Sequence, residues 1–380
     1  MRGVLTEGKR MGVGTDDAIW GSPEVLTTRN GELARLMSED KLLLVKGIEG
    51  LGNRMLCALT GILYARLTGR KLLVDWGDFF YSSDGSNAFP GFFQCSSCAL
   101  AGDIPQTDSV RPAIWRGHLD ESGWSMRERY GNYHALSVNV ARLDYEEDVV
   151  VLCTFGDAVE ALRNHFSRVL KVFAGESRGA ILRRLLHENL QLHPRIRERV
   201  DQFKRERFTQ ATVGVHVRYT DLRSNLWTIL KTLNALLKRV PDLQIFLATD
   251  SLLVRAVFEE NYPAVVTTPH WYAPAPGVAI HYNEHRPDAM ESGVEALVDL
   301  YLLAECDYLI IDTHSTFAYV AKLLAKAPDS SILDVWDGKI SSVRSRKLTY
   351  RLMVRLGLYS WGLRPISFLV RIQRLLQGAR

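Results

Sequence analysis

The sequence predicts an α/β fold with two domains. Short apolar runs alternate with segments of helical periodicity, first over residues 41–205 and again over 206–338. Such alternation is typical of parallel sheets with helices on both faces. The chain also has 380 residues, which exceeds the usual size of a single hydrophobic core. We therefore expect two Rossmann-like domains that face each other across a cleft.

The first domain is expected to begin after a polar, Gly-rich segment, residues 1–40, which we interpret as a flexible arm. Its opening unit consists of a strand at 42–45, a helix that follows the turn Gly47–Asn53, and a strand at 71–75. A β-α-β unit of this kind predicts parallel pairing with a right-handed crossover. The apolar residues of its helix recur at helical spacing: Met55, Leu59, Ile62 and Leu63.

The rest of the first domain is less regular. Residues 76–148 hold aromatic, Gly and Ser residues with little periodicity, so we expect a loop-rich region that lines an acceptor site. A strand is predicted at 149–153. Helices are expected at 157–172 and at 177–208, and the second of these is interrupted near Pro194.

The second domain repeats the alternation without repeating the sequence. Its expected strands lie at 213–217, 243–248, 265–266 and 308–311, and its expected helices at about 226–239, 252–261, 290–305 and 317–326. This order predicts a second doubly wound sheet.

Arg218 is the residue from which the functional interpretation starts. An apolar strand ends at Val217, and Arg218 and Asp221 follow directly. A cation at the carboxyl end of a buried strand is where an open α/β sheet binds an anionic ligand. The planar guanidinium of arginine can make two parallel hydrogen bonds to a phosphate. The alternative is an ion pair with Asp221 that only ties a loop.

Two further strand ends of this domain carry polar residues and belong to the same sheet edge. Ser315 and Thr316 open a predicted helix, whose first N–H groups can bind phosphate. Asp250 or Asp299 can accept hydrogen bonds from a nucleobase or a ribose. The alternatives are plain helix capping for the hydroxyl residues and solvent exposure or capping for the carboxylates.

The turn Gly47–Asn53 is neither of the common phosphate-binding loops. Its glycines follow the pattern G-x-x-G-x-G, and no G-K-[ST] follows. The glycines still allow close approach of the backbone to a ligand. Asn53 is expected at the helix start, where it either reaches into the cleft or caps the helix.

His216 alternates with its apolar neighbours and His314 lies in a polar loop, so each is a donor-site candidate or a packed histidine.

Composition and motifs exclude several classes of protein. Hydrophobic residues make up 47% of the chain and charged residues 24%, as in ordinary globular proteins. We find no secretory signal and no apolar run near the roughly 20 residues of a spanning helix. A reducing cytoplasm is therefore the simplest compartment.

Cys95 and Cys98 form the only close cysteine pair, which we interpret as ordinary thiols, with a redox or metal role as the alternative. No HExxH motif or carboxylate cluster suggests a metal.

Four segments resemble, in order, motifs of the α1,6-fucosyltransferases, the family of the nodulation-factor and N-glycan-core enzymes. Val215–Asp221 resembles the family motif H-V-R-R-T-D. Phe246–Asp250 resembles the second motif and Ala304–Ala321 the third. Gly50–Asn53 resembles the first loop of the wider fucosyltransferase superfamily. The resemblance covers roughly residues 41–335 and is strongest in the second half.

The resemblance implies a GT-B-like fold, with the acceptor on the first domain and the nucleotide-sugar donor on the second. It implies metal-independent, inverting transfer of fucose from GDP-fucose to a glycan, without a cofactor. Arg218 matches the family arginine that holds the donor diphosphate. Asp299 and Ser315 match positions that contact the nucleotide, and Asn53 matches an asparagine that faces the sugar. We expect catalytic roles for Arg218, Asp221 and Asn53, and donor binding by Gly50, His216, Arg218, Asp250, Asp299, His314, Ser315 and Thr316.

The chain departs from the family at Tyr219, which stands where the second arginine of the motif is expected. The family segment proposed to supply a base has no counterpart in Leu222–Trp227, so Asp221 is only a candidate for that role. Two other hypotheses stay open. One is a non-catalytic protein of the same fold that binds a nucleotide or a glycan, and the other is a transferase that uses another nucleotide sugar.

The end of the chain is strongly basic. Residues 339–380 contain ten Lys and Arg residues and no Asp or Glu, so the net charge of +4 hides a mildly acidic remainder. Leu348, Leu352 and Leu356 recur every four residues and form one apolar stripe. We expect a basic amphipathic tail over 340–380 that contacts the anionic inner face of the membrane. The alternative is a helix packed on the protein itself, and nucleic acid is not an expected partner.

Overall fold

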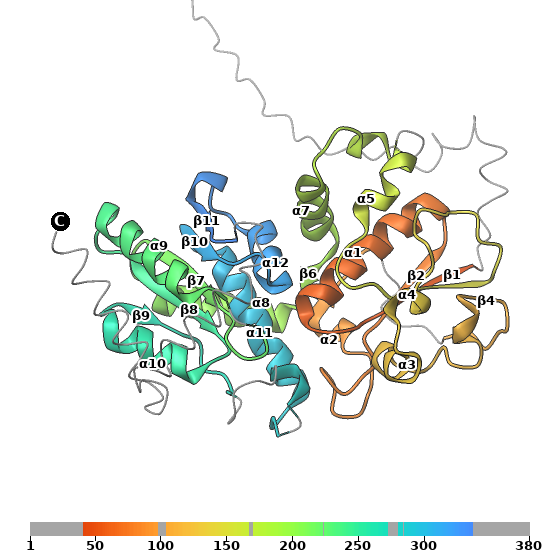
Figure 1. Ribbon diagram of the computed structural model, residues 1–380, viewed down its shortest axis with the longest axis horizontal. Helices are drawn as coiled ribbons and strands as arrows, with labels where there is room; N and C mark the ends of the chain where they lie inside the picture. The colour runs from red at the N-terminus through yellow and green to blue at the C-terminus, as the bar shows by residue number, and fades with distance from the viewer. Residues whose placement is uncertain are drawn as a thin grey trace, which may run out of the picture.

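The computed structural model describes residues 41–97, 104–166, 170–222, 224–272, 280–283 and 285–336. The predicted arm, residues 1–40, and the basic tail, residues 339–380, lie outside this part of the chain. Two α/β domains follow one another along the long axis of the molecule (Figure 1). The described part of the chain thus has the predicted architecture.

The sheet of the first domain has the strand order β2-β1-β5-β4, and every pair is parallel. Its members are β1 (Leu42–Lys46), β2 (Lys71–Asp75), β4 (Val110–Arg111) and β5 (Val149–Leu152). Helix α1 (Leu51–Thr68) connects β1 to β2 and ends at Gly69, whose φ of 72° is left-handed. The predicted β-α-β unit is therefore confirmed.

The region expected to be irregular contains short elements that periodicity does not reveal. Besides β4, it holds α2 (Phe89–Phe92), α3 (Gly123–Tyr130) and α4 (Tyr133–Leu136). Asn132 and Ser122 cap the last two helices through their side chains. Helices of four to eight residues show too few turns to produce a recognisable apolar stripe.

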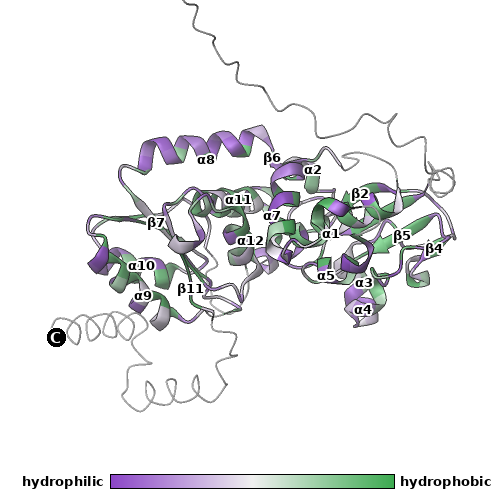
Figure 2. Ribbon diagram, turned by 90° about the horizontal axis from the view of Figure 1, so that it is seen from above, coloured by the Kyte–Doolittle hydropathy of each residue, from purple (hydrophilic) through white to green (hydrophobic). Residues whose placement is uncertain are grey.

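The single helix expected at 157–172 is only partly correct. Among the described residues of this stretch, α5 (Val159–Leu162) continues directly into a 3-10 turn at Arg163–His165, and another 3-10 turn lies at Lys171–Phe173. Residues 167–169 lie outside the described part of the chain. The helical stretch expected at 177–208, with an interruption near Pro194, is confirmed, because α7 (Arg178–Asn189) and α8 (Pro194–Arg207) are separated just before Pro194. The short strand β6 (Gln191–Leu192) lies between them and pairs with β3 (Phe93–Gln94). Figure 2 shows α8 as hydrophilic along most of its length, since it buries only Ile196 and Val200.

The sheet of the second domain has the order β11-β10-β7-β8-β9 and is also parallel throughout. Its strands are β7 (Thr212–Val217), β8 (Gln244–Thr249), β9 (Val265–Val266), β10 (Tyr308–Ile311) and β11 (Ile332–Asp334). The edge strand β11 was not predicted. It has three half-buried residues and therefore no continuous apolar run.

Helices cover both faces of this second sheet. On one face, α9 (Leu226–Arg239) and α10 (Leu252–Asn261) enclose an apolar cluster with Val213, Val215 and Val217. On the other face lie α11 (Ala289–Ala304) and α12 (Thr316–Leu324). The side chain of His216 points to this second face, as its alternation with the valines predicts.

The two domains share a continuous hydrophobic core. One apolar cluster runs from α1 and α7 in the first domain to α11 and α12 in the second. Gly52 of α1 lies so close to α12 that a Cβ atom there would be 2.5 Å from the carbonyl carbon of Thr316. The first turns of α1 and α12 are therefore neighbours, although 264 residues separate Gly52 from Thr316 in the sequence.

Candidate functional site

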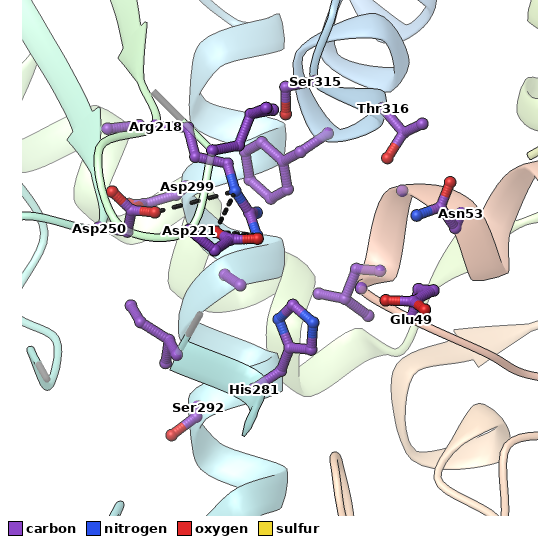
Figure 3. Close-up of a pocket in the computed structure, with 18 of the residues that line it drawn as sticks. Glu49, Asn53, Arg218, Asp221, Asp250, His281, Ser292, Asp299, Ser315 and Thr316 are labelled. Atoms are coloured by element: carbon purple, nitrogen blue, oxygen red, sulfur yellow. Dashed lines mark hydrogen bonds and ion pairs between the residues drawn. The ribbon is translucent and has the colours of Figure 1, made fainter. Parts of the chain in front are cut away.

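A cavity of about 440 Å³ lies between the domains (Figure 3). The carboxyl ends of β7 and β8, the first turns of α1 and α12, and one side of α11 contribute to its wall. All the residues that the sequence singled out for a site line this one cavity: Gly50, Asn53, His216, Arg218, Asp221, Asp250, Asp299, His314, Ser315 and Thr316. The structure thus brings them together, while the role of each remains a prediction.

Arg218 follows β7 and is held by a two-pronged ion pair. Its Nε and Nη2 atoms donate to the two carboxylate oxygens of Asp221 at 3.0 and 2.9 Å. Burial raises the pKa of Asp221, but the charge and hydrogen bonds of Arg218 outweigh this effect, so the pKa is lowered overall. The ion pair of the alternative interpretation therefore exists. The same ion pair holds the Arg218 guanidinium at the cavity wall, and 22% of the Arg218 side chain is exposed.

Asp250 fixes the turn that carries Arg218. One of its oxygens accepts from the backbone N–H of Tyr219 and the other from the hydroxyl of Thr220, both at 2.6 Å. Burial raises the pKa of this carboxyl group. The side chain of Tyr219 packs against the apolar cluster under α9 and α10, and it is not among the residues that line the cavity.

Asp299 lies on α11 at another wall of the cavity. The hydroxyl of Thr268 donates to its carboxylate at 2.5 Å, and Nδ1 of His270 is 3.9 Å away. Burial raises the pKa of Asp299, and His270 opposes this effect. With only 8% of its surface exposed, Asp299 is not the solvated or capping carboxylate of the alternative interpretation.

The first turn of α12 offers unused hydrogen-bonding groups. Ser315 occupies the N-cap position, yet its side chain makes no capping hydrogen bond, so the simple capping alternative is wrong for this residue. Thr316 begins the helix beside it. The ring of His314 stacks on Trp336 with 4.6 Å between centroids and 7° between planes, so this histidine is a packed residue at the cavity wall.

The first turn of α1 differs from the prediction. Gly50, and not Asn53, occupies the N-cap position, because the helix starts three residues earlier than the asparagine suggested. Asn53 lies within the first turn, where its N–H donates to the Gly50 carbonyl at 3.0 Å. Its side chain is buried, and Oδ1 has no hydrogen-bond partner among the described residues. The partial positive ends of α1 and α12 thus meet at the cavity.

His216 is buried beneath this meeting point. Its ring stacks on Phe317 with centroids 5.1 Å apart. Burial, and then the neighbouring Arg218 charge, lower the pKa of His216 to about 3. The imidazole is therefore neutral at physiological pH. Its Nδ1 atom has no partner within the described part of the chain.

Glu49 is a cavity residue that the sequence analysis missed. Its backbone is left-handed, with a φ of 61°, and its carboxylate accepts hydrogen bonds from the hydroxyls of Tyr133 and Tyr282. Arg127 adds an ion pair at 3.4 Å. The tyrosines lie 84 and 233 residues away in sequence, so no local motif could have revealed this group.

The cysteines correct one expectation. Cys95 is disulfide-bonded, so it is not the ordinary thiol that the sequence suggested. Cys57, Cys153 and Cys306 are free and buried. Among the residues that the structure describes, no three His, Cys, Asp or Glu side chains gather in a way that would hold a metal ion. In the same residues, no helix is long and apolar enough to cross a membrane.

Comparison with known proteins identifies relatives over most of the described chain. Residues 179–335 match the family model of nodulation protein Z (NodZ). Nodulation protein Z of Bradyrhizobium diazoefficiens is 23% identical over 306 residues, which span 76% of this chain and 80% of the relative. The Azorhizobium caulinodans protein of the same name is 24% identical over 294 residues, or 69% of this chain and 82% of the relative.

Solved structures show the same fold. The crystal structure of fucosyltransferase NodZ from Bradyrhizobium matches with a TM-score of 0.52 at 24% identity, over 79% of this chain and 96% of that one. NodZ α-1,6-fucosyltransferase co-crystallised with GDP matches with a TM-score of 0.50 at 24% identity, over 75% and 93%. The predicted resemblance to this family and the GT-B-like fold are therefore confirmed, at the low identity of a divergent relative.

Proposed function

We propose that this protein is a glycosyltransferase that transfers fucose from GDP-fucose to a hydroxyl group of a glycan. The observation that carries the proposal is the convergence of Arg218 with the first turns of α1 and α12 on one interdomain cavity. An arginine and two helix N-termini together provide the positive charge that a nucleoside diphosphate requires. The related NodZ proteins, one of them crystallised with GDP and one soaked with GDP-fucose, support GDP-fucose as the donor.

The cavity suggests a place for each part of the donor. We assign the diphosphate to Arg218, Ser315 and Thr316, because these groups lie at the carboxyl edge of the second sheet. We assign the nucleoside to the wall that carries Asp299. In this arrangement Arg218 stabilises the charge that develops on the leaving diphosphate, so the transfer proceeds without a metal ion. The second domain then binds the donor and the first domain the acceptor.

The reaction also needs a group that receives the acceptor proton. The acceptor oxygen forms a bond to the anomeric carbon, the bond from that carbon to the phosphate oxygen breaks, and GDP leaves. Asp221 is a poor base because Arg218 lowers its pKa. Glu49 lies on the first-domain wall, opposite Arg218 and beside Asn53 (Figure 3). We assign the acceptor proton to the Glu49 carboxylate and contact with the transferred sugar to Asn53.

Ligand specificity and turnover test the proposal directly. Thermal-shift measurements with GDP, UDP, ADP and their sugars should show stabilisation by GDP and GDP-fucose, and Arg218→Ala should lose it. Stabilisation by UDP alone would replace fucose by another sugar. Binding of GDP without release of GDP from GDP-fucose, across a panel of glycans, would instead identify a non-catalytic binding protein.

We further propose that the basic tail, residues 340–380, attaches the protein to an anionic membrane surface. The support is its sequence: arginines alternate with a leucine stripe and with Trp361 and Phe368. Deletion of the tail should move the protein from vesicles that contain phosphatidylserine into the supernatant. Equal binding of both forms to these vesicles would exclude this attachment.

A further inference from the structure

His281 lines the cavity beside the residues assigned to the donor. It lies in the 3-10 turn Ile280–Tyr282, between β9 and α11 in the sequence. Figure 3 shows its ring within the cavity, between Asp221 on the second domain and Glu49 on the first. His281 therefore faces the space that the diphosphate and the transferred sugar occupy in the proposed donor complex.

Contacts with the first domain hold the ring in this position. It stacks on Tyr81 with centroids 6.4 Å apart and planes 21° apart. A Cβ atom at Gly50 would lie 3.3 Å from its Cε1 atom, closer than most such contacts. Within its own domain, Arg286 donates a hydrogen bond to the backbone carbonyl of His281 and so fixes the turn that carries the ring. The absence of a side chain at Gly50 thus gives the imidazole its place against the first turn of α1.

The imidazole is neutral and has an unused nitrogen. Burial lowers the pKa of His281 to about 3, with further lowering by Arg218, Arg54 and Arg286 and an opposing effect of Asp221. Its Nε2 atom is buried and has no hydrogen-bond partner among the described residues. A neutral imidazole offers one N–H donor and one acceptor, so it can donate to an anionic ligand without carrying charge itself.

The cavity has few cationic side chains for a diphosphate. Among the described residues that line it, Arg218 is the single Arg or Lys side chain. Tyr219 occupies the position of the second arginine in the family motif, and its side chain packs toward the apolar cluster instead. Neutral N–H and O–H groups must therefore supply most of the hydrogen bonds to the phosphoryl oxygens, and His281 faces the same space as Arg218.

We propose that His281 is a further donor-binding residue, whose Nε2–H group donates a hydrogen bond to a phosphoryl oxygen of the nucleotide sugar. The inference rests on the proposed function, because it assumes a nucleoside diphosphate in this cavity. It adds a contact that does not belong to the recognised motifs and that compensates in part for the missing arginine. It also explains why Gly50 has no room for a side chain.

Two substitutions separate the hydrogen bond from the packing. His281→Phe keeps an aromatic ring but removes the donor, and His281→Gln keeps an N–H near the position of Nε2. His285→Phe is the matched control, because His285 is an exposed imidazole in the same segment. Calorimetric titration of the full-length proteins with GDP and with guanosine gives the readout, and the melting temperature of each variant reports whether it is folded.

We expect His281→Phe to weaken GDP binding about tenfold, as the loss of one hydrogen bond to a charged group does, and to leave guanosine binding unchanged. His281→Gln should recover part of the affinity, and His285→Phe should bind as the wild type does. In the ¹⁵N spectrum of the wild type, the Nε2 signal of His281 should shift on addition of GDP. This readout does not depend on the folding of any variant.

Two negative results have different meanings. A wild-type protein that binds GDP, together with an unchanged affinity in His281→Phe and an unmoved Nε2 signal, would overturn this contact and leave the proposed function intact. A wild-type protein that binds neither GDP nor GDP-fucose would overturn both. Equal weakening of GDP and guanosine in His281→Phe would show that the ring only packs the cavity wall.

Discussion

Gly52 of α1 lies against the backbone of Thr316 at the start of α12, where a Cβ atom would approach the carbonyl carbon to 2.5 Å. The contact brings two helix N-termini from different domains to one cavity. It also forms part of the continuous apolar cluster that joins the domains. A side chain at position 52 would therefore push the wall that carries Ser315 and Thr316 away from the wall that carries Asn53.

Substitution of this glycine tests how closely the two helices must approach. Gly52→Ala should lower the free energy of unfolding by about 1–3 kcal/mol, as overpacking of a buried contact does, and should weaken GDP binding. Urea unfolding and calorimetric titration measure the two effects. Gly179→Ala in α7 is the control, because a Cβ there meets nothing within 4 Å. It should be neutral or slightly stabilising. Equal stability of both variants would contradict the close contact.

Replacement of Arg218 by any residue without a planar guanidinium should reduce the activity. Arg218→Lys keeps the charge but cannot hold both oxygens of Asp221, so its orientation in the cavity is lost. We expect kcat to fall at least tenfold in Arg218→Lys, and the thermal shift with GDP to vanish in Arg218→Ala. Because the side chain is partly exposed, both variants should keep the wild-type circular dichroism spectrum. Full turnover in Arg218→Lys would show that charge alone is sufficient.

Glu49→Gln separates proton transfer from donor binding. The amide keeps the shape of the side chain but cannot take a proton, so kcat should fall by a factor of roughly 10² or more. GDP affinity should stay near that of the wild type. Glu128→Gln, on the exposed side of α3, serves as the control and should leave kcat unchanged. An unaltered kcat in Glu49→Gln would indicate a reaction that needs no protein base on this wall.

The sequence predicts the second half of the site better than the first, and the reason is physical. Arg218 and Asp250 directly follow apolar strands, and parallel strands bring their carboxyl ends to one edge, so local patterns suffice to place them together. Glu49 depends on contacts with Tyr133 and Tyr282, and His281 depends on a contact with Tyr81. In each case the partner is distant in the sequence. The hydrophobic periodicity of the sequence does not reveal such contacts.

The helix boundaries show the same limit on a smaller scale. Asn53 has the residue type of a cap, and the sequence therefore predicted a helix that begins there. The chain instead starts α1 after Gly50, whose lack of a side chain leaves room for the ring of His281. A tertiary contact thus overrides the local preference. The difference at 157–172 has a related cause, since periodicity alone does not distinguish one continuous α-helix from a short α-helix that continues into a 3-10 turn.

Two histidines of the cavity wall, His216 and His281, should make the stability depend on pH below neutrality. Both His216 and His281 have a pKa of about 3 in the folded protein, far below the ordinary value of about 6.5 in the unfolded chain. The unfolded state therefore binds more protons between these values, so the stabilising contribution is complete above pH 6.5 and is lost as the pH falls toward 3.

At pH 5, each histidine should lower the free energy of unfolding by about 2 kcal/mol relative to pH 7.5, because the shift acts over about 1.5 pH units. Urea unfolding at the two pH values measures the loss in the wild type and in His281→Phe, where the loss should be smaller by about 2 kcal/mol. His285→Phe should behave as the wild type does, since His285 is exposed. An identical pH dependence in His281→Phe and the wild type would mean that the imidazole of His281 is not held neutral by burial, and would remove the basis for treating it as an uncharged donor.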